Sequence, residues 1–346
     1  MGRKATEKHT RRSSMSPKVY VLCGPGGVGK TTVSAALSIA LAQKGYRTAV
    51  LTIDPARRLA DSLQIGKLDN TPRRVPLDNG ILDALMLDPK ETFDRFVEQH
   101  ATPEDAKKLL ANRYYQFASE KMGGVQEYTA MIRLLNLYNS GSYDAIVLDT
   151  PPSRNALEFL RAPQRMAHLM ERSALKYFAK PKGFRALAFG SEILSKGLKL
   201  FLGVEMIDDI SLFFSHFGVI GQAMYKASQH ADDLLHKSLF YMVSSTRQSI
   251  SECTIFQQQL EAENYPFAGY ILNRVPILHA SIPEVKTEGM EWIDWVIRNT
   301  KREQEQFRKQ KEELTKKSSF WSIPEQEQCP NRIEALQHLS KHLNLF

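Results

Sequence analysis

The chain has 346 residues, a formal net charge of +8, and 42% hydrophobic and 24% charged residues, as is ordinary for a folded protein in water. No stretch approaches the ~18 consecutive apolar residues of a membrane span, and no apolar segment follows the basic N-terminus. We therefore expect neither a membrane helix nor a secretory leader. The three cysteines, Cys23, Cys253 and Cys329, lie far apart. This spacing predicts reduced thiols in the cytoplasm, rather than disulfides or a metal site.

The first 17 residues are predicted to form a disordered basic tail, because they carry charge and serine but no apolar pattern. Six basic residues and one acidic residue lie within residues 1–18 and account for most of the net charge. The body that follows carries only a small excess of positive charge. The charge therefore favours a solvated tail and does not favour a nucleic-acid partner.

The first predicted strand, Val19–Cys23, leads into the run Gly24–Thr31 and then into an Ala- and Leu-rich helix, Thr32–Lys44. The run GPGGVGKT fits the phosphate-binding pattern G-x-x-x-x-G-K-[ST] at every fixed position. A strand, loop and helix in this order direct backbone N–H groups and a helix N-terminus at one place. We predict a triphosphate site in which Lys30 reaches the β- and γ-phosphates and Thr31 holds Mg²⁺. The residues predicted to bind the nucleotide here are Gly26, Gly27, Val28, Gly29, Lys30, Thr31 and Thr32.

Further apolar strands are predicted at Tyr46–Ile53, Ala84–Leu87, Tyr143–Leu148, Leu239–Val243, Phe267–Leu272 and Phe320–Ile323. Continuous apolar strands joined by helices indicate an α/β fold with a mostly parallel, doubly wound sheet. Ligands in such sheets bind at the carboxyl ends of the strands. Asp54, Asp149 and Asn273 fall at those ends.

Two carboxylates at strand ends are candidates for hydrolytic chemistry. Tyr143–Asp149 has the form of a Walker B element, which predicts that Asp149 holds Mg²⁺ through water. The alternative is that Asp149 only caps the turn before Pro151. Asp54 follows the strand beside the phosphate loop, so we predict that it positions the attacking water near the metal. Its alternative role is the N-cap of the next helix.

Two helical regions, 90–140 and 155–235, interrupt the alternation, and we expect them to form a subdomain inserted into a phosphate-loop domain of residues 18–346. The second region holds seven of the seventeen phenylalanines in the chain: Phe178, Phe184, Phe189, Phe201, Phe213, Phe214 and Phe217. Apolar residues recur there at helical spacing. They form either an ordinary buried core or an exposed apolar surface. Thr300–Lys317 is predicted to be a charged helix that faces solvent.

Three segments together resemble the arsenical-pump ATPase family: Gly24–Thr32, Asp54–Ala56 followed by Leu59, Asp61 and Leu63, and Asp149–Pro152. That family includes the guided-entry ATPases that target tail-anchored membrane proteins. It belongs to the deviant phosphate-loop NTPases, together with MinD, ParA and nitrogenase iron protein. The resemblance spans residues 17–345, and Asp149–Leu157 is most similar to the bacterial branch.

The resemblance implies a dimeric switch that binds ATP or ADP with Mg²⁺ and hydrolyses ATP. Asp54 matches the switch I Asp that orients the hydrolytic water, and Asp149 matches the switch II Asp near the metal. Asn273 matches the strand-end Asn that reads adenine, and Pro324 is expected to pack on the base. The helical insert matches a region that forms a hydrophobic groove when two subunits close. A hydrophobic protein segment or a lipid is therefore expected at residues 173–225.

Three departures from the family pattern affect the expected mechanism. Pro25 stands where the family has a lysine that crosses the dimer interface. Hydrolysis is therefore expected to be slow, to use an arginine such as Arg57, Arg58 or Arg154, or to need a paralogue that keeps the lysine. Arg57 and Arg58 also replace the family's usual His-Asn. Without a zinc-binding C-x-x-C or a cysteine triad, we expect no zinc clamp and no arsenite pumping.

Two alternatives stay open beside a self-sufficient ATPase, which would be a homodimer. One is a weakly catalytic or non-catalytic nucleotide-binding subunit that forms a heterodimer with a lysine-bearing paralogue. The other is a MinD/ParA-like positioning ATPase, with Ile333–Phe346 as a membrane helix, although we expect that segment to pack back on the sheet. We expect a cytoplasmic protein, with peripheral attachment at the inner membrane as an alternative.

Overall fold

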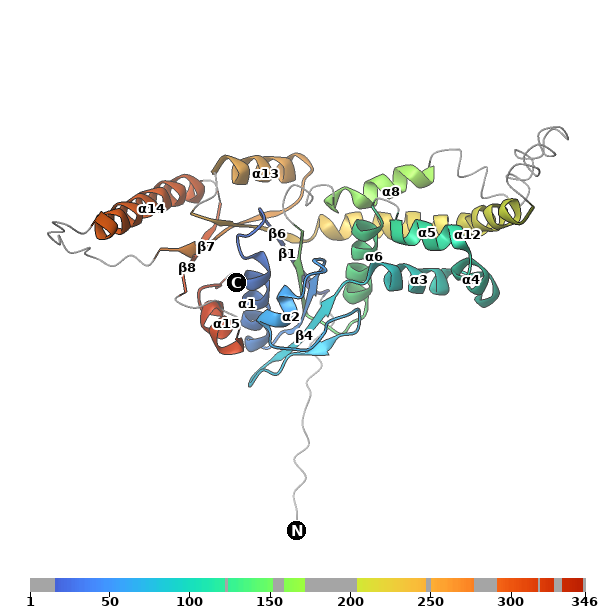
Figure 1. Cartoon of the computed structure of the whole chain (residues 1–346), viewed down its shortest axis with the longest axis horizontal. Coiled ribbons are helices and arrows are strands. Elements are labelled where there is room, and N and C mark those ends of the chain that lie inside the picture. The colour runs from blue at the N-terminus through green and yellow to red at the C-terminus, as the bar shows by residue number, and fades with distance from the viewer. Residues whose placement is uncertain are drawn as a thin grey trace, which may run out of the picture.

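The computed structural model describes residues 16–121, 124–151, 159–171, 204–246, 250–276, 291–316, 318–326 and 332–344. These residues form one eight-stranded sheet in the order β3-β4-β2-β5-β1-β6-β7-β8 (Figure 1). All neighbouring strands are parallel except β3, which pairs antiparallel with β4. The strands are β1 (Lys18–Cys23), β2 (Arg47–Thr52), β3 (Arg73–Arg74), β4 (Ile81–Met86), β5 (Ala145–Asp149), β6 (Leu239–Ser245), β7 (Phe267–Val275) and β8 (Phe320–Pro324).

The predicted α/β fold with a mostly parallel, doubly wound sheet is confirmed. Each of the seven predicted strands is present, with ends shifted by a few residues at most. The sequence did not predict β3, which has two exposed residues and pairs only at the edge of the sheet. A strand of two arginines shows no apolar alternation, so no pattern could reveal it.

Helices cover both faces of the sheet because successive strand residues point to opposite faces. Tyr20 and Leu22 of β1 pack on the face covered by α1 (Lys30–Gln43), α2 (Arg58–Ser62) and α15 (Ile333–Ser340). Val19 and Val21 pack on the other face, which is covered by α6 (Val125–Asn139), the end of α12 (Val204–Leu235) and α13 (Ile250–Ala262). This arrangement leaves the carboxyl ends of the central strands open to a ligand.

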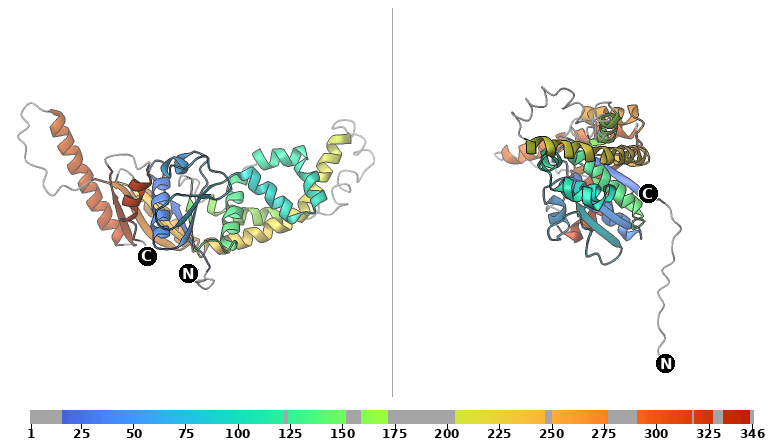
Figure 2. Two further views of the ribbon diagram at one scale, coloured as in Figure 1. Left: turned by 90° about the horizontal axis from the view of Figure 1, so that it is seen from below. Right: turned by 90° about the vertical axis from the view of Figure 1, so that its right-hand side faces the viewer.

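A group of helices extends from one side of the sheet (Figures 1 and 2). It comprises α3 (Pro89–His100), α4 (Pro103–Leu110), α5 (Arg113–Lys121), α8 (Ala162–Glu171), α6 and most of α12. Asp88 caps α3 by accepting from Glu91 N, Thr102 caps α4 by accepting from Asp105 N, and proline opens both helices. A separate apolar core joins the group and includes Phe96, Tyr128 and Met224. That the two helical regions form one inserted subdomain of a domain spanning 18–346 stays a prediction.

The proposed hydrophobic region falls largely outside what the structure describes. Phe178, Phe184, Phe189 and Phe201 lie outside the described residues, as do the tail of residues 1–15 and Arg154. The described side chains of α12 do not include Phe213, Phe214 or Phe217. The choice between a buried core and an exposed surface at 173–225 therefore stays open.

The C-terminal elements lie on the other side of the molecule from the helical group (Figure 2). Helix α14 (Glu291–Thr315) buries Phe307 and Leu314 while Trp292 and Trp295 stay exposed. The predicted charged helix, Thr300–Lys317, thus falls mostly in α14, which ends at Thr315 and buries part of one face. Leu336, Leu339 and Leu343 are buried in the core beside α1, so the C-terminal segment packs on the sheet as expected. Among the described helices, none is long and apolar enough to cross a membrane.

Candidate functional site

The phosphate loop links the end of β1 to the start of α1. Its backbone turns through left-handed conformations at Gly27 and Gly29, which have φ angles of +79° and +88°. Gly29 is the N-cap of α1 and supplies no side chain to cap it. Backbone N–H groups at the start of α1 are therefore left for a ligand, as an anion site at a helix N-terminus requires.

Gly24 lies at the end of β1, where the backbone comes close to the neighbouring strand β6. A Cβ built on Gly24 would lie 2.1 Å from the carbonyl oxygen of Val243 in β6, whereas a Cβ on Gly27 meets no atom within 4 Å. Both glycines have positive φ angles, so alanine would be strained at either position. We expect Gly24→Ala to lower the free energy of unfolding by about 3 kcal/mol and Gly27→Ala by about 1 kcal/mol, measured by urea denaturation. Equal losses in the two variants would contradict the close contact with β6.

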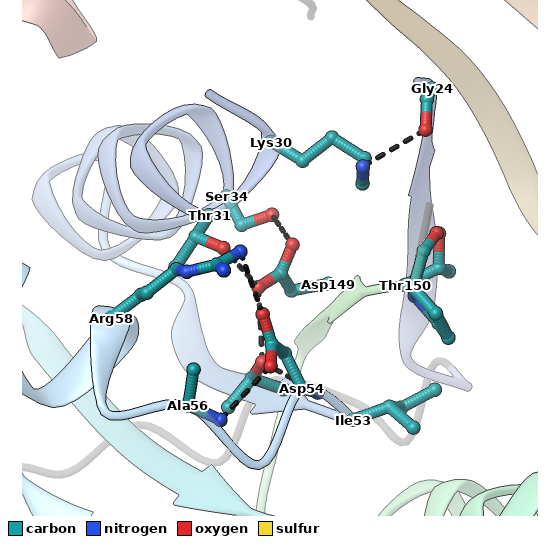
Figure 3. Close-up of polar contacts among 12 residues, drawn as sticks. Gly24, Lys30, Thr31, Ser34, Ile53, Asp54, Ala56, Arg58, Asp149 and Thr150 are labelled. Carbon is teal, nitrogen blue, oxygen red and sulfur yellow. Dashed lines mark hydrogen bonds and ion pairs between the residues drawn. The ribbon is translucent and has the colours of Figure 1, made fainter. Parts of the chain in front are cut away.

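Lys30 opens α1 and turns back over the loop. Its side chain is buried, and Nζ donates to the carbonyl oxygen of Gly24 at 2.9 Å (Figure 3). Nζ also donates to the carbonyl oxygen of Pro25 at 2.8 Å. Burial lowers the pKa of the Lys30 ammonium, and the nearby Asp149 carboxylate acts in the opposite direction. The ammonium is thus held at the loop beside an acidic group, where it can meet an anionic ligand.

Asp149 ends β5 and is 1% exposed. Its Oδ2 accepts from Thr31 Oγ1 at 2.8 Å and from Thr52 Oγ1 at 3.0 Å, and its Oδ1 accepts from Ser34 Oγ at 3.4 Å. Burial raises the pKa of the carboxyl group, while the hydrogen bonds from Thr31 and Thr52 act to lower it. The hydrogen bonds run to α1 and β2 rather than to the turn before Pro151. They therefore support a role at the phosphate loop over the turn-capping alternative.

Asp54 lies just beyond β2 and is held in place by two contacts (Figure 3). Its Oδ1 accepts from Ala56 N at 2.9 Å, and its Oδ2 forms an ion pair with Arg58 Nη1 at 3.0 Å. The N-cap of α2 is Arg57, so the alternative that Asp54 caps this helix is wrong. Asp54 instead closes a local turn. Its charge is near enough to raise the pKa values of both Lys30 and Asp149.

Asn273 and Pro324 occupy the neighbouring strands β7 and β8. Asn273 is buried, and its Nδ2 donates to the carbonyl oxygen of Val28 in the phosphate loop at 2.9 Å. A Cβ on Gly29 would approach the same nitrogen to 2.4 Å, so glycine is needed there. Pro324 pairs with Val275 one strand farther out. The structure thus brings Asn273 against the loop, while adenine recognition by Asn273 and Pro324 stays a prediction.

A family model described as anion-transporting ATPase matches residues 17–345. The chain belongs to the anion-transporting ATPase family. This confirms the resemblance drawn from the motifs.

Named relatives in the family match about half of this chain or less. A putative arsenical pump-driving ATPase of Prosthecochloris vibrioformis is 31% identical over 173 residues, which cover 47% of this chain and 40% of the relative. ATPase ASNA1 homolog 1 of Paramecium tetraurelia is 29% identical over 184 residues, covering 49% of this chain and 51% of the relative. ATPase get3 of Schizosaccharomyces pombe is 31% identical over 141 residues, covering 40% of this chain and 41% of the relative.

Several polar residues at this site were not predicted from the sequence. Ser34 and Thr52 surround Asp149, and Thr150 Oγ1 donates to the carbonyl oxygen of Leu22 at 2.8 Å. Ser34 follows Thr31 by three residues on the same helix face, which is a usable signal. No pattern in the sequence marks Gln126 as a residue near the site. It lies in the first turn of α6, and its Nε2 donates to the carbonyl oxygen of Ile53 at 3.1 Å.

The two cysteines in the described part of the chain form no disulfide with each other. Cys23 and Cys253 are buried free thiols, and burial raises the pKa of Cys23 to about 12. Cys329 lies outside the described residues. Within the ranges that the structure describes, no group of three or more His, Cys, Asp or Glu side chains could hold a metal ion. The absence of a zinc clamp stays a prediction.

Proposed function

We propose that this protein hydrolyses ATP to ADP and phosphate and acts as a nucleotide-operated switch. One observation carries the proposal: Thr31 and Asp149 are hydrogen-bonded at the phosphate loop, and the charges of Lys30 and Asp54 lie close enough to affect the pKa of Asp149. These residues connect α1 with the carboxyl ends of β2 and β5, which are adjacent strands of the sheet. Membership in a family of ATPases supports the same activity.

The residues at the loop fit a magnesium nucleotide. The Lys30 ammonium contacts two carbonyl oxygens of the loop, and phosphate oxygens can take up the same donors. Thr31 Oγ1 and Asp149 Oδ2 lie 2.8 Å apart and are the hard oxygen donors that Mg²⁺ prefers. When bound, the metal neutralises charge on the β- and γ-phosphates. Asn273 and Pro324 are the residues that we propose for the adenine base.

Asp54 would accept a hydrogen bond from the attacking water and so orient it in line with the γ-phosphorus. The water oxygen forms the new bond to phosphorus while the bond to the bridging oxygen breaks, so ADP leaves and one proton of the water passes to an oxygen of the phosphate product. Lys30 stabilises negative charge on the phosphates throughout. Asp54 serves this role because Ala56 N and Arg58 fix its carboxylate at the strand end.

A direct contact joins the nucleotide site to the helical group. Gln126, at the start of α6, bonds to the carbonyl oxygen of Ile53, which precedes Asp54. Helix α6 in turn packs in the core shared with α3 and α12. We propose that rearrangement of the Asp54 segment on ATP binding reaches these helices through Gln126. Two subunits would then close, and a hydrophobic protein segment or a lipid would bind at residues 173–225.

Arg58 is the arginine that we propose to act at the water-orienting carboxylate. It is paired with Asp54, whereas Arg57 is an exposed neighbour that lines a small surface cavity. Arg58→Ala is expected to lower the rate of ATP turnover about tenfold, equal to roughly 1.4 kcal/mol of transition-state stabilisation. Arg57→Ala is the matched control and should stay near the wild-type rate. Both rates are read from phosphate release, and equal effects of the two variants would contradict a specific role for Arg58.

Pro25 supports a second candidate, a nucleotide-binding subunit that works beside a paralogue. Proline carries no charge to reach across a dimer interface, although the carbonyl of Pro25 does accept from Lys30. Phosphate release by the purified chain in ATP and Mg²⁺ separates the two candidates. Saturable turnover supports the self-sufficient switch. Tight ATP binding without turnover supports the paired subunit, and no saturable ATP binding contradicts both.

A further inference from the structure

We propose that a polar cavity between α3 and α6 is a second anion-binding site, which takes a small ligand bearing phosphate or carboxylate oxygens. The cavity has a volume of about 320 Å³. Every residue that lines it carries an amide, hydroxyl or guanidinium group: Asn70, Thr92, Arg95, Gln99, Arg133, Asn136, Asn139 and Ser140. None of these residues belongs to the phosphate loop or to the Asp54 segment, so the inference does not rest on the proposed function.

Arg133 is the central observation. Its Nε is shielded from solvent and has no hydrogen-bond partner among the described residues, while its Nη2 donates to the carbonyl oxygen of Asn70. No carboxylate in the described ranges forms an ion pair with it. Burial, and then the charge of Arg95, lower the pKa of Arg133. A guanidinium nevertheless stays charged in proteins, so a partly buried cation is left with unused donor capacity.

The neighbouring charges leave the cavity positive. Arg95 lines it and forms an ion pair with Glu91 at 2.5 Å, one turn earlier on α3. That carboxylate is therefore engaged by Arg95, and Arg133 supplies an excess positive charge. Buried charges in proteins are normally paired, and a bidentate oxyanion matches the geometry of a guanidinium. An anion in this cavity would pair with the positive charge of Arg133, which no described side chain does.

The floor of the cavity is built and rigid. Asn70 is buried, and its Nδ2 donates to Thr92 Oγ1 at 3.0 Å and to the carbonyl oxygen of Asp88 at 3.2 Å. Its Oδ1 accepts from Asp88 N at 2.9 Å. These bonds fix the carbonyl that holds Arg133, so the guanidinium is positioned before any ligand arrives. The amides of Gln99, Asn136 and Asn139 add further donors around the opening.

Anion titrations of the full chain test the site. We would use the Lys30→Met chain, in which the phosphate loop has lost its ammonium, and titrate inorganic phosphate and citrate separately by calorimetry. Saturable binding is expected for at least one of them. Arg133→Met should weaken it at least about tenfold through loss of a charge-assisted contact. Arg165→Met, an exposed arginine on α8, is the matched control and should bind as before.

A second variant is needed because Arg133→Met could weaken anion binding through a loss of packing instead of a loss of charge. Asn136 is exposed at the cavity, and Asn136→Asp keeps the size of the side chain while adding a negative charge. We expect it to weaken anion binding roughly fivefold without lowering the melting temperature. Binding of phosphate alone or citrate alone supports the site and identifies the ligand class. Absence of binding, or binding unchanged in both variants, overturns the proposal.

Discussion

Replacing Lys30 with methionine is expected to abolish ATP turnover and to weaken ATP binding by about a hundredfold. The ammonium is the buried cation that contacts the loop carbonyls of Gly24 and Pro25, directly beside the phosphate-binding backbone. Methionine keeps the length and the apolar stem but removes the charge. Fluorescence titration with a labelled ATP analogue measures the affinity, and phosphate release measures the turnover.

Lys108→Met is the control for this charge change. Lys108 lies on α4 and forms an exposed pair with Glu104, far along the chain from the loop. It should leave affinity and turnover unchanged. If Lys30→Met bound ATP as tightly as the wild-type chain, the phosphate loop would not be the nucleotide site.

Asp54→Asn is expected to lower turnover about a thousandfold while ATP affinity changes less than about threefold. The amide keeps the shape of the side chain, but it removes the charge that pairs with Arg58 and that would hold the attacking water. Because Asp54 touches neither Lys30 nor Thr31 through a hydrogen bond among the described residues, the phosphate contacts should survive. Single-turnover hydrolysis and equilibrium binding, measured on the same preparation, separate the two effects.

The matched control is Asp61→Asn in the same segment. Asp61 is exposed within α2 and lies one turn beyond Arg57. Its loss should leave turnover within about twofold of the wild-type rate. Equal losses in the two variants would mean that the segment needs its charge in general, and not a carboxylate at position 54.

Local patterns were enough to predict the sheet and the phosphate loop. Each of the seven predicted strands is a short apolar run, and the loop is a contiguous motif, so neither depends on distant residues. The placement of Asp149 was also predictable, because a parallel sheet brings the ends of β2 and β5 together. The segment Ile333–Phe346 was expected to pack back on the sheet, and Leu336 and Leu339 are buried there.

The features that the sequence did not predict depend on contacts between segments far apart in the chain. Gln126 reaches Ile53 across 73 positions, and no local pattern marks it. The N-cap alternative for Asp54 was wrong because α2 begins only at Arg58, which shifts the cap to Arg57. No local pattern marks Arg133 either, because its contact with Asn70 joins residues 63 positions apart.

The central claim is that nucleotide operates the switch, and the mass of the protein in solution tests it most directly. Light scattering after size exclusion would be run on the Asp54→Asn chain in ATP with Mg²⁺, and on the wild-type chain in ADP with Mg²⁺. The account predicts a mass of two chains for the ATP-bound variant and a looser or dissociated assembly in ADP. A single-chain mass in both nucleotides, with ATP shown to be bound, would contradict a self-sufficient dimeric switch.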